Sequence, residues 1–232
     1  MRIVERMKSG IPGLDKLMQG GFVKNSVNLI AGMAGTGKTI FCSQFLLEGA
    51  RKGEAGIYVT LEESKESILD DLSTFNWGEE FEGYAGKHIL IVDAEVPTDF
   101  KELSDTVTTL IKKYNVKRLV LDSLSIASMG WKVSSMDVAK TRREAFDFMG
   151  ILRKAGLTSL LITEVPEAEN KLSKFGFEEF LADSVIVLHY LEYAAGGTPR
   201  SLLIRKMRRT KHGADIYPID INDKGLALAP NK

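Results

Sequence analysis

The sequence predicts an α/β fold, in which a mainly parallel sheet is flanked by helices and closed by a C-terminal antiparallel hairpin. Short apolar runs that end in polar residues alternate with longer segments of helical periodicity, which is typical of parallel strands connected by helices. After His189 this alternation stops, and strand-like runs follow one another without a helix. The length of 232 residues fits one domain, so we expect a single α/β domain over residues 1–232.

Six apolar runs locate the parallel strands. Each run is short and bounded by polar or turn-forming residues, as expected of strands buried on both faces. The strands are expected at residues 27–31, 55–61, 89–93, 118–122, 158–163 and 184–189. Segments of helical periodicity fill the intervals, at residues 38–51, 65–75, 100–114 and 138–154. Residues 201–207 and 217–221 are expected to form the closing hairpin.

Two connections are long and irregular, at residues 128–137 and 166–180. Long loops at the carboxyl ends of parallel strands usually face a ligand or a partner. The first loop contains Trp131 and the second contains Phe175 and Phe177. Packing explains these aromatic residues as well as binding does.

The most specific chemical signal is the run G-M-A-G-T-G-K-T, which matches the phosphate-binding pattern GxxxxGK[ST] and directly follows a predicted strand. Glycines without Cβ atoms let backbone amides surround phosphate groups closely. A lysine then neutralises the terminal phosphates, a threonine hydroxyl ligates Mg²⁺, and the following helix adds its positive end. The residues expected to bind the nucleotide are Gly32, Met33, Ala34, Gly35, Thr36, Gly37, Lys38 and Thr39, with Thr39 also serving the metal. The alternative is a glycine-rich turn with an incidental lysine.

Acidic residues follow two further predicted strands. Asp122 ends the strand R-L-V-L-D, which suits a carboxylate that serves Mg²⁺; the alternative is a helix N-cap. Glu62 and Glu63 follow the strand G-I-Y-V-T-L, and one of them is a candidate general base for hydrolysis. The alternative for this pair is that both are first-turn acids that stabilise the next helix.

Composition excludes several classes of protein. Lys plus Arg equals Asp plus Glu at 31 each, so there is no global attraction to nucleic acid or to anionic membranes. The single cysteine, Cys42, predicts a buried thiol in a reducing compartment rather than a disulfide. No segment has the length of a membrane span, and the first ten residues lack the apolar core of a signal peptide. We expect a cytoplasmic protein without a membrane partner.

Several segments together resemble KaiC, within the RecA/RadA superfamily of ATPases. They are G-I-P-G-L-D-K-L-M-Q-G-G at residues 10–21, the phosphate-binding loop, Y-V-T-L-E-E-S at 58–64, L-V-L-D-S at 119–123 and K-M-R-R-T-K-H at 206–212. The resemblance extends over residues 10–221. It implies a RecA-like P-loop NTPase core that binds ATP and Mg²⁺. It also implies assembly into a homo-oligomer, such as a hexameric ring, with ATP held between neighbouring subunits.

The resemblance also assigns roles to individual residues. It makes Glu62 the general base and Glu63 its neighbour, with Thr39 and Asp122 serving the metal. It places a polar γ-phosphate sensor at Thr163.

In the C-terminal motif, the resemblance makes Lys206 and Arg208 cations that reach the nucleotide of the adjacent subunit, and His212 also matches. A cation inserted from outside the loop stabilises charge that spreads over the departing phosphoryl group, and a guanidinium offers fixed donors for this. The alternative is a solvated basic hairpin.

The predicted function is that of a homo-oligomeric, Mg²⁺-dependent ATPase with a regulatory or signalling role. The alternatives are a low-turnover ATP-binding switch or scaffold, a RadA-like recombination or repair protein, and a protein kinase. KaiC has two such domains, with phosphorylation sites in the second, so we expect no clock oscillator from one domain. Only about nine residues precede the shared opening, so no RadA-type DNA-binding domain is expected. Residues 166–180 carry four glutamates and two lysines, a balance that disfavours nucleic acid.

Overall fold

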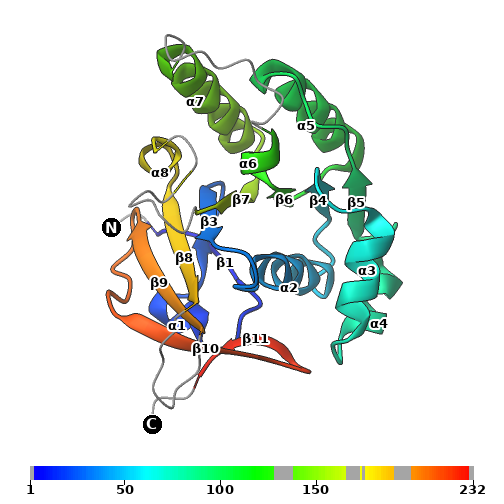
Figure 1. The fold of residues 1–232 in the computed structure, drawn as a ribbon, viewed down its shortest axis with the longest axis vertical. Coiled ribbons are helices and arrows are strands. Elements are labelled where there is room, and N and C mark those ends of the chain that lie inside the picture. The colour runs from blue at the N-terminus through cyan, green and yellow to red at the C-terminus, as the bar shows by residue number, and fades with distance from the viewer. Residues whose placement is uncertain (1–2, 128–137, 166–172, 174–175, 191–199, 230–232) are drawn as a thin grey trace.

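The structure is a computed structural model that describes residues 3–127, 138–165, 173, 176–190 and 200–229 (Figure 1). Its main feature is a sheet with the strand order β11-β10-β9-β8-β3-β7-β6-β4-β5. The parallel strands are β3 (Val27–Gly32), β4 (Gly56–Thr60), β5 (Ile89–Asp93), β6 (Arg118–Asp122), β7 (Thr158–Glu164) and β8 (Ser184–Tyr190). All six predicted parallel strands are therefore confirmed.

Three antiparallel strands extend the sheet beyond β8. They are β9 (Arg200–Met207), β10 (Ile216–Asn222) and β11 (Gly225–Leu228). The predicted C-terminal hairpin is confirmed as the pair β9–β10. A further strand, β11, pairs back on the end of β10, from Ile219 opposite Leu228 to Asn222 opposite Gly225.

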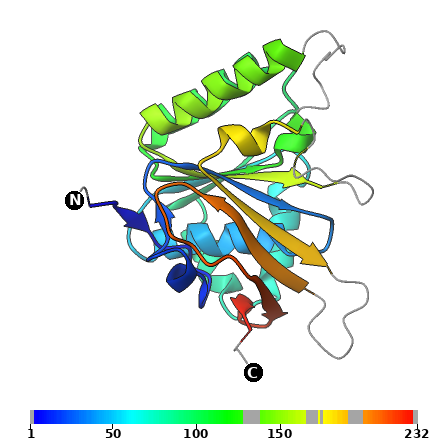
Figure 2. The same cartoon turned by 90° about the vertical axis from the view of Figure 1, so that its left-hand side faces the viewer.

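Helices cover both faces of the sheet (Figure 2). One face is covered by α1 (Leu14–Leu17), α2 (Lys38–Ala50), α3 (Lys65–Ser73) and α4 (Gly78–Tyr84). The other face is covered by α5 (Phe100–Tyr114), α6 (Leu124–Ala127), α7 (Val138–Lys154) and α8 (Glu178–Leu181). Within β3, Leu29 packs on the α5–α7 side and Ile30 on the α2 side, so the strand is apolar on both faces.

Short elements account for most differences from the sequence expectation. The helices α1, α4, α6 and α8 and the two-stranded sheet of β1 (Arg6–Met7) and β2 (Phe22–Val23) were not predicted. These elements span two to seven residues, which is too little sequence for a periodic pattern to emerge. The start of α8 lies within the segment expected to be irregular, whereas residues 128–137 and 166–172 lie outside the described residues.

Arg118 ties the helix after the phosphate-binding loop to the strand that ends in Asp122. Its guanidinium is 1% exposed, pairs with Glu54 at 2.7 Å and lies over the Phe45 ring at 4.5 Å from the centroid. It also donates to the backbone oxygens of Phe45 at 2.7 Å and Lys8 at 2.9 Å. These contacts hold α2 against the start of β6.

The register of the parallel strands brings the candidate residues to one edge. Gly32 is paired with Glu164, and Thr60 is paired with Asp122. Because parallel strands end on the same side, the phosphate-binding loop and the acidic residues leave the sheet together. None of the helices in the described ranges combines the length and apolar character that a membrane span requires. Cys42 is buried, as expected, and burial raises the pKa of its thiol.

Candidate functional site

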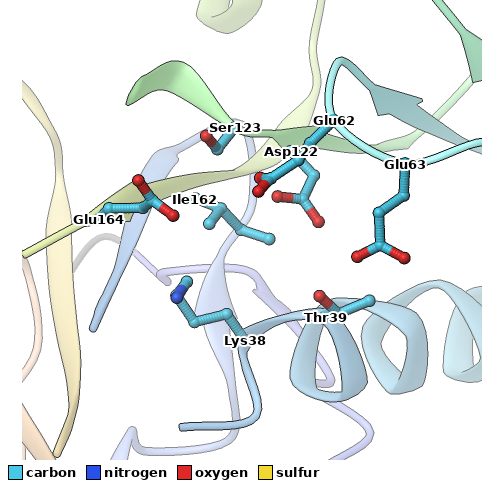
Figure 3. A pocket seen from close by; sticks show the side chains of 8 residues that line it. All are labelled: Lys38, Thr39, Glu62, Glu63, Asp122, Ser123, Ile162 and Glu164. Carbon is cyan, nitrogen blue, oxygen red and sulfur yellow. The ribbon is translucent and has the colours of Figure 1, made fainter. Parts of the chain in front are cut away.

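A pocket lies at the carboxyl edge of the parallel strands (Figure 3). Its walls come from the start of α2, the ends of β6 and β7, and the segment after β4. The lining residues are Lys38, Thr39, Glu62, Glu63, Asp122, Ser123, Ile162 and Glu164. Figure 3 shows the Lys38 and Thr39 side chains on one side of the pocket and the acidic side chains on the other. Five of the predicted site residues are therefore brought together.

The phosphate-binding loop is tightly curled between β3 and α2. Gly35 and Gly37 have φ values of 73° and 95°, in the left-handed region that favours glycine. A Cβ atom at Gly32 would lie 2.7 Å from the Leu188 oxygen, so the first glycine is needed for close approach. Gly37 offers no side chain to cap α2, which leaves the amides of the first turn available to an anion.

Lys38 is the cation of this loop. Its Nζ donates to the Met33 carbonyl oxygen at 2.8 Å, and the Thr36 hydroxyl donates to the same oxygen at 2.8 Å. Burial lowers the pKa of Lys38, and nearby carboxylates oppose that shift, Glu164 most strongly. The ammonium group thus lies among carboxylates at the place where the loop would hold phosphate.

Asp122 is a half-buried acid whose surroundings suit a cation. The pKa of Asp122 rises to about 6, mainly because of burial. A hydrogen bond from the Tyr58 hydroxyl at 2.5 Å opposes this rise, whereas the negative charge of Glu62 increases it. In the described ranges no lysine or arginine pairs with this carboxylate. The Thr39 hydroxyl lines the same pocket. Carboxylate and hydroxyl oxygens are hard ligands, so the two residues fit Mg²⁺.

The N-cap alternative for Asp122 is wrong. Ser123 precedes α6, and its hydroxyl oxygen accepts a hydrogen bond from the Ile126 amide at 3.1 Å. Capping of α6 therefore falls to Ser123, and the Asp122 side chain faces the pocket instead.

The first-turn alternative for Glu62 and Glu63 is also wrong. Ser64 is the N-cap of α3, its hydroxyl accepts the Ser67 amide at 3.1 Å, and the first-turn acid is Glu66. The pair thus precedes the helix and lines the pocket.

The two glutamates differ in their contacts. Partial burial raises the pKa of Glu62, and the charges of Glu164 and Glu63 raise it further. The Glu63 carboxylate accepts from the Ser67 hydroxyl at 3.0 Å, which ties it to α3. Glu62 therefore holds a proton more tightly than an ordinary glutamate does, whereas Glu63 is held by its contact with α3.

Thr163 does not line this pocket. It is fully buried, and its hydroxyl lies 3.4 Å from that of Ser125 on the α6 side of the sheet. Successive strand residues face opposite sides, so Ile162 and Glu164 reach the pocket while Thr163 points away from it. The polar side chain that β7 presents to this pocket is Glu164, and the sensor role of Thr163 stays a prediction.

Arg200 is another residue that sequence reasoning missed. Its Nε donates to the Gly35 carbonyl oxygen at 3.0 Å, and its guanidinium lies over the Tyr190 ring at 5.2 Å. The first residue of β9 therefore contacts the phosphate-binding loop. No local motif marks this arginine, because its partner lies 165 positions away in the chain.

Lys206 and Arg208 lie away from the pocket of their own chain. Lys206 donates to the backbone oxygens of Ala182 at 2.7 Å and Glu179 at 2.9 Å, at the end of α8. Arg208 donates to the Phe180 oxygen at 3.2 Å. Both contacts lie on the α5–α7 side of the sheet, near the start of β8, whereas the loop follows the end of β3.

The structure does not bring the C-terminal motif into the site. Lys206 is half-buried, and burial lowers its pKa, so it is not part of a fully solvated basic hairpin. Arg208 is exposed. His212 Nδ1 lies 2.7 Å from the Gly213 oxygen, and none of the three residues lines the described pocket. The three residues therefore lie away from this pocket in their own chain.

Comparison with known proteins agrees with this geometry. The model of the family described as "ATPase: KaiC" matches residues 7–232. A crystal structure of a KaiC-like protein from the hyperthermophilic archaeon Pyrococcus horikoshii OT3 is similar, with a TM-score of 0.84 and 38% identity, over 98% of this chain and 100% of that one.

Two curated relatives are also similar to this chain. A UPF0273 protein of Thermotoga maritima is 32% identical over 99% of this chain and 98% of its own length. The circadian clock protein KaiC3 of Synechocystis is 32% identical over 98% of this chain, which spans only 46% of that relative. With a RecA-like fold, a phosphate-binding loop and a family match over nearly all its length, this chain belongs to the KaiC family of ATPases.

Proposed function

We propose that this chain is a homo-oligomeric, Mg²⁺-dependent ATPase with a regulatory or signalling role. The observation that carries the proposal is the convergence of Lys38, Thr39, Asp122 and Glu62 on one pocket. A nucleotide needs amides and a cation for its phosphates, oxygen ligands for its metal and a base for the attacking water. This pocket offers each of these groups.

Binding of the triphosphate would rest on the loop between β3 and α2. Uncapped amides at the start of α2 and the Lys38 ammonium group attract the phosphates. Thr39 and Asp122 would hold Mg²⁺, which when bound neutralises phosphate charge. Arg200 approaches the same loop from β9 and adds positive charge there.

Glu62 is the proposed general base. It accepts a proton from the water whose oxygen attacks the γ-phosphorus, the bond to the β-phosphate oxygen breaks, and ADP and phosphate are released. The raised pKa of Glu62 strengthens its carboxylate as a proton acceptor. Glu63 contributes to that elevation through its own charge.

The trans contribution comes from the C-terminal motif of a neighbouring subunit. Lys206 is paired with Val185, three residues along β8 from Leu188, which faces the start of the loop at Gly32. This separation corresponds to roughly 10 Å along the strand. The Lys206 side chain also points to the face of the sheet that α8 covers. Lys206, Arg208 and His212 are therefore proposed to act on the nucleotide of an adjacent copy, in a ring such as a hexamer.

Phosphate release by the purified protein tests the proposal. We expect Mg²⁺-dependent release that is reduced by at least about 100-fold in Glu62→Gln, because the base is lost while the charge distribution changes little elsewhere. Glu66→Gln, in the first turn of α3, is the matched control and should retain wild-type activity. Full activity in Glu62→Gln would remove the proposed base.

A low-turnover nucleotide switch is the second candidate function. It is favoured by Lys206, whose ammonium group is already engaged with three backbone oxygens at α8 and must leave them to reach a neighbour. ATP binding and nucleotide-dependent assembly with negligible hydrolysis would support this candidate over the first.

A further inference from the structure

Tyr58 lies beneath the pocket, in the middle of β4. It is fully buried and is paired with Val120 on β6, so Asp122 lies two residues further along the neighbouring strand on the same face. The long tyrosine side chain bridges this diagonal, and its hydroxyl donates to Asp122 Oδ2 at 2.5 Å. A tyrosine on an apolar strand face thus ends at the proposed metal site.

The phenol is the donor in this contact. Burial raises the pKa of Tyr58 well above its ordinary value, and the charge of Asp122 raises it further. The Tyr58 hydroxyl therefore keeps the proton that it donates to Asp122 Oδ2.

This hydrogen bond has a consequence for the proposed metal ligand Asp122. A carboxylate whose Oδ2 accepts from Tyr58 is held in one orientation, with Oδ1 left for a cation or its water. One buried phenol on β4 thus orients a ligand that comes from the neighbouring strand β6.

We propose that Tyr58 is a positioning residue for the divalent cation, which it serves by orienting Asp122 without touching the metal or the nucleotide. The inference rests on the proposed function, because it concerns the metal of that same pocket. Outer-sphere partners of this kind typically change metal affinity by about 10- to 100-fold when removed. The rest of the Tyr58 side chain packs with the α2 side of the core, and that packing is retained by phenylalanine.

The test is a Mg²⁺ titration of nucleotide binding by Tyr58→Phe, followed with a fluorescent ATP analogue. We expect the half-saturating Mg²⁺ concentration to rise by at least about tenfold. Binding of the same analogue in EDTA should stay within about twofold of wild type, since Tyr58 does not contact the phosphate-binding amides. Tyr84→Phe, which removes a hydroxyl from α4, is the matched control and should titrate as wild type.

A merely structural role gives a different pattern. Thermal unfolding of Tyr58→Phe in EDTA would then show a loss of stability, while the half-saturating Mg²⁺ concentration stays within twofold of wild type, and that result overturns the inference. If wild type binds the analogue with strong Mg²⁺ dependence and Tyr58→Phe does the same, only this inference fails. If folded wild type does not bind the analogue, the proposed function fails and the role of Tyr58 with it.

Discussion

Gly32 and Glu164 are paired neighbours on β3 and β7, so the phosphate-binding loop and the Glu164 carboxylate leave the sheet side by side. Glu164 is the carboxylate that acts most strongly on Lys38, and it also raises the pKa of Glu62. Its negative charge therefore acts on both the phosphate-binding cation and the proposed base.

Replacing Glu164 by Gln should change affinity and pH dependence together. Removal of a negative charge beside the loop is expected to tighten ATP binding several-fold, which calorimetry would measure. The same change lowers the pKa of Glu62, so its base form persists to lower pH and the acidic limb of the pH–rate profile moves to lower pH. An unchanged acidic limb would show that the two carboxylates are not coupled.

Asp122→Asn should stabilise the protein in EDTA while abolishing the effect of Mg²⁺ on nucleotide binding. The pKa of Asp122 is raised to about 6, so the folded state holds this proton more tightly than the unfolded state does. The contribution of Asp122 to the free energy of unfolding in EDTA is therefore fully present below about pH 4 and is lost as pH rises to about 6, by on the order of 3 kcal/mol. Asparagine avoids that loss, so the melting temperature at pH 7 should rise by several degrees. A melting temperature below that of wild type would contradict the raised pKa.

Arg118→Met should destabilise the fold by about 2 to 4 kcal/mol. The change leaves backbone oxygens of Phe45 and Lys8 without their donor and Glu54 without its buried partner. Chemical denaturation would measure it. Arg143→Met removes an exposed pair with Asp147 on α7 and is the control, with an expected change within about 0.5 kcal/mol. Equal effects would show that the buried guanidinium is not an anchor.

Mixed oligomers test the shared site. Glu62→Gln and Lys206→Ala should each have little activity alone, whereas an equal mixture should recover roughly a quarter of wild-type sites. In a random mixture, half of the pockets keep Glu62, and half of these have a neighbouring subunit that keeps Lys206, which leaves about a quarter of the sites complete. Each variant is first checked for a wild-type melting temperature, because Lys206 also holds α8. Activity of the mixture equal to the average of the two variants would argue against catalysis across subunits.

Sequence reasoning predicted the parts of this fold that have long or repeated patterns. The six parallel strands are apolar runs, and the loop at residues 32–39 has a fixed spacing of glycines and a lysine. Both patterns can be seen directly in a sequence. Glu62, Glu63 and Asp122 were found because they end such runs, and the strand register brings them to one pocket.

What sequence reasoning missed depends on register and on contacts between distant segments. Thr163 and Glu164 are adjacent, and only the pairing of β7 with its neighbours decides which of them faces the pocket. Arg200 contacts Gly35, which lies 165 positions away in the chain. The sequence identifies Tyr58 only as a residue of an apolar strand, without its contact with Asp122. Such contacts follow from the folded sheet rather than from local composition.

Isothermal titration calorimetry of the folded protein with ATP and Mg²⁺ tests the central claim most directly. We predict saturable binding of one nucleotide per chain, weakened when Mg²⁺ is removed and lost in Lys38→Ala, whose ammonium group lies in the loop. Binding that persists unchanged in Lys38→Ala, or the absence of any binding by folded wild-type protein, would contradict the assignment of this pocket to a nucleotide.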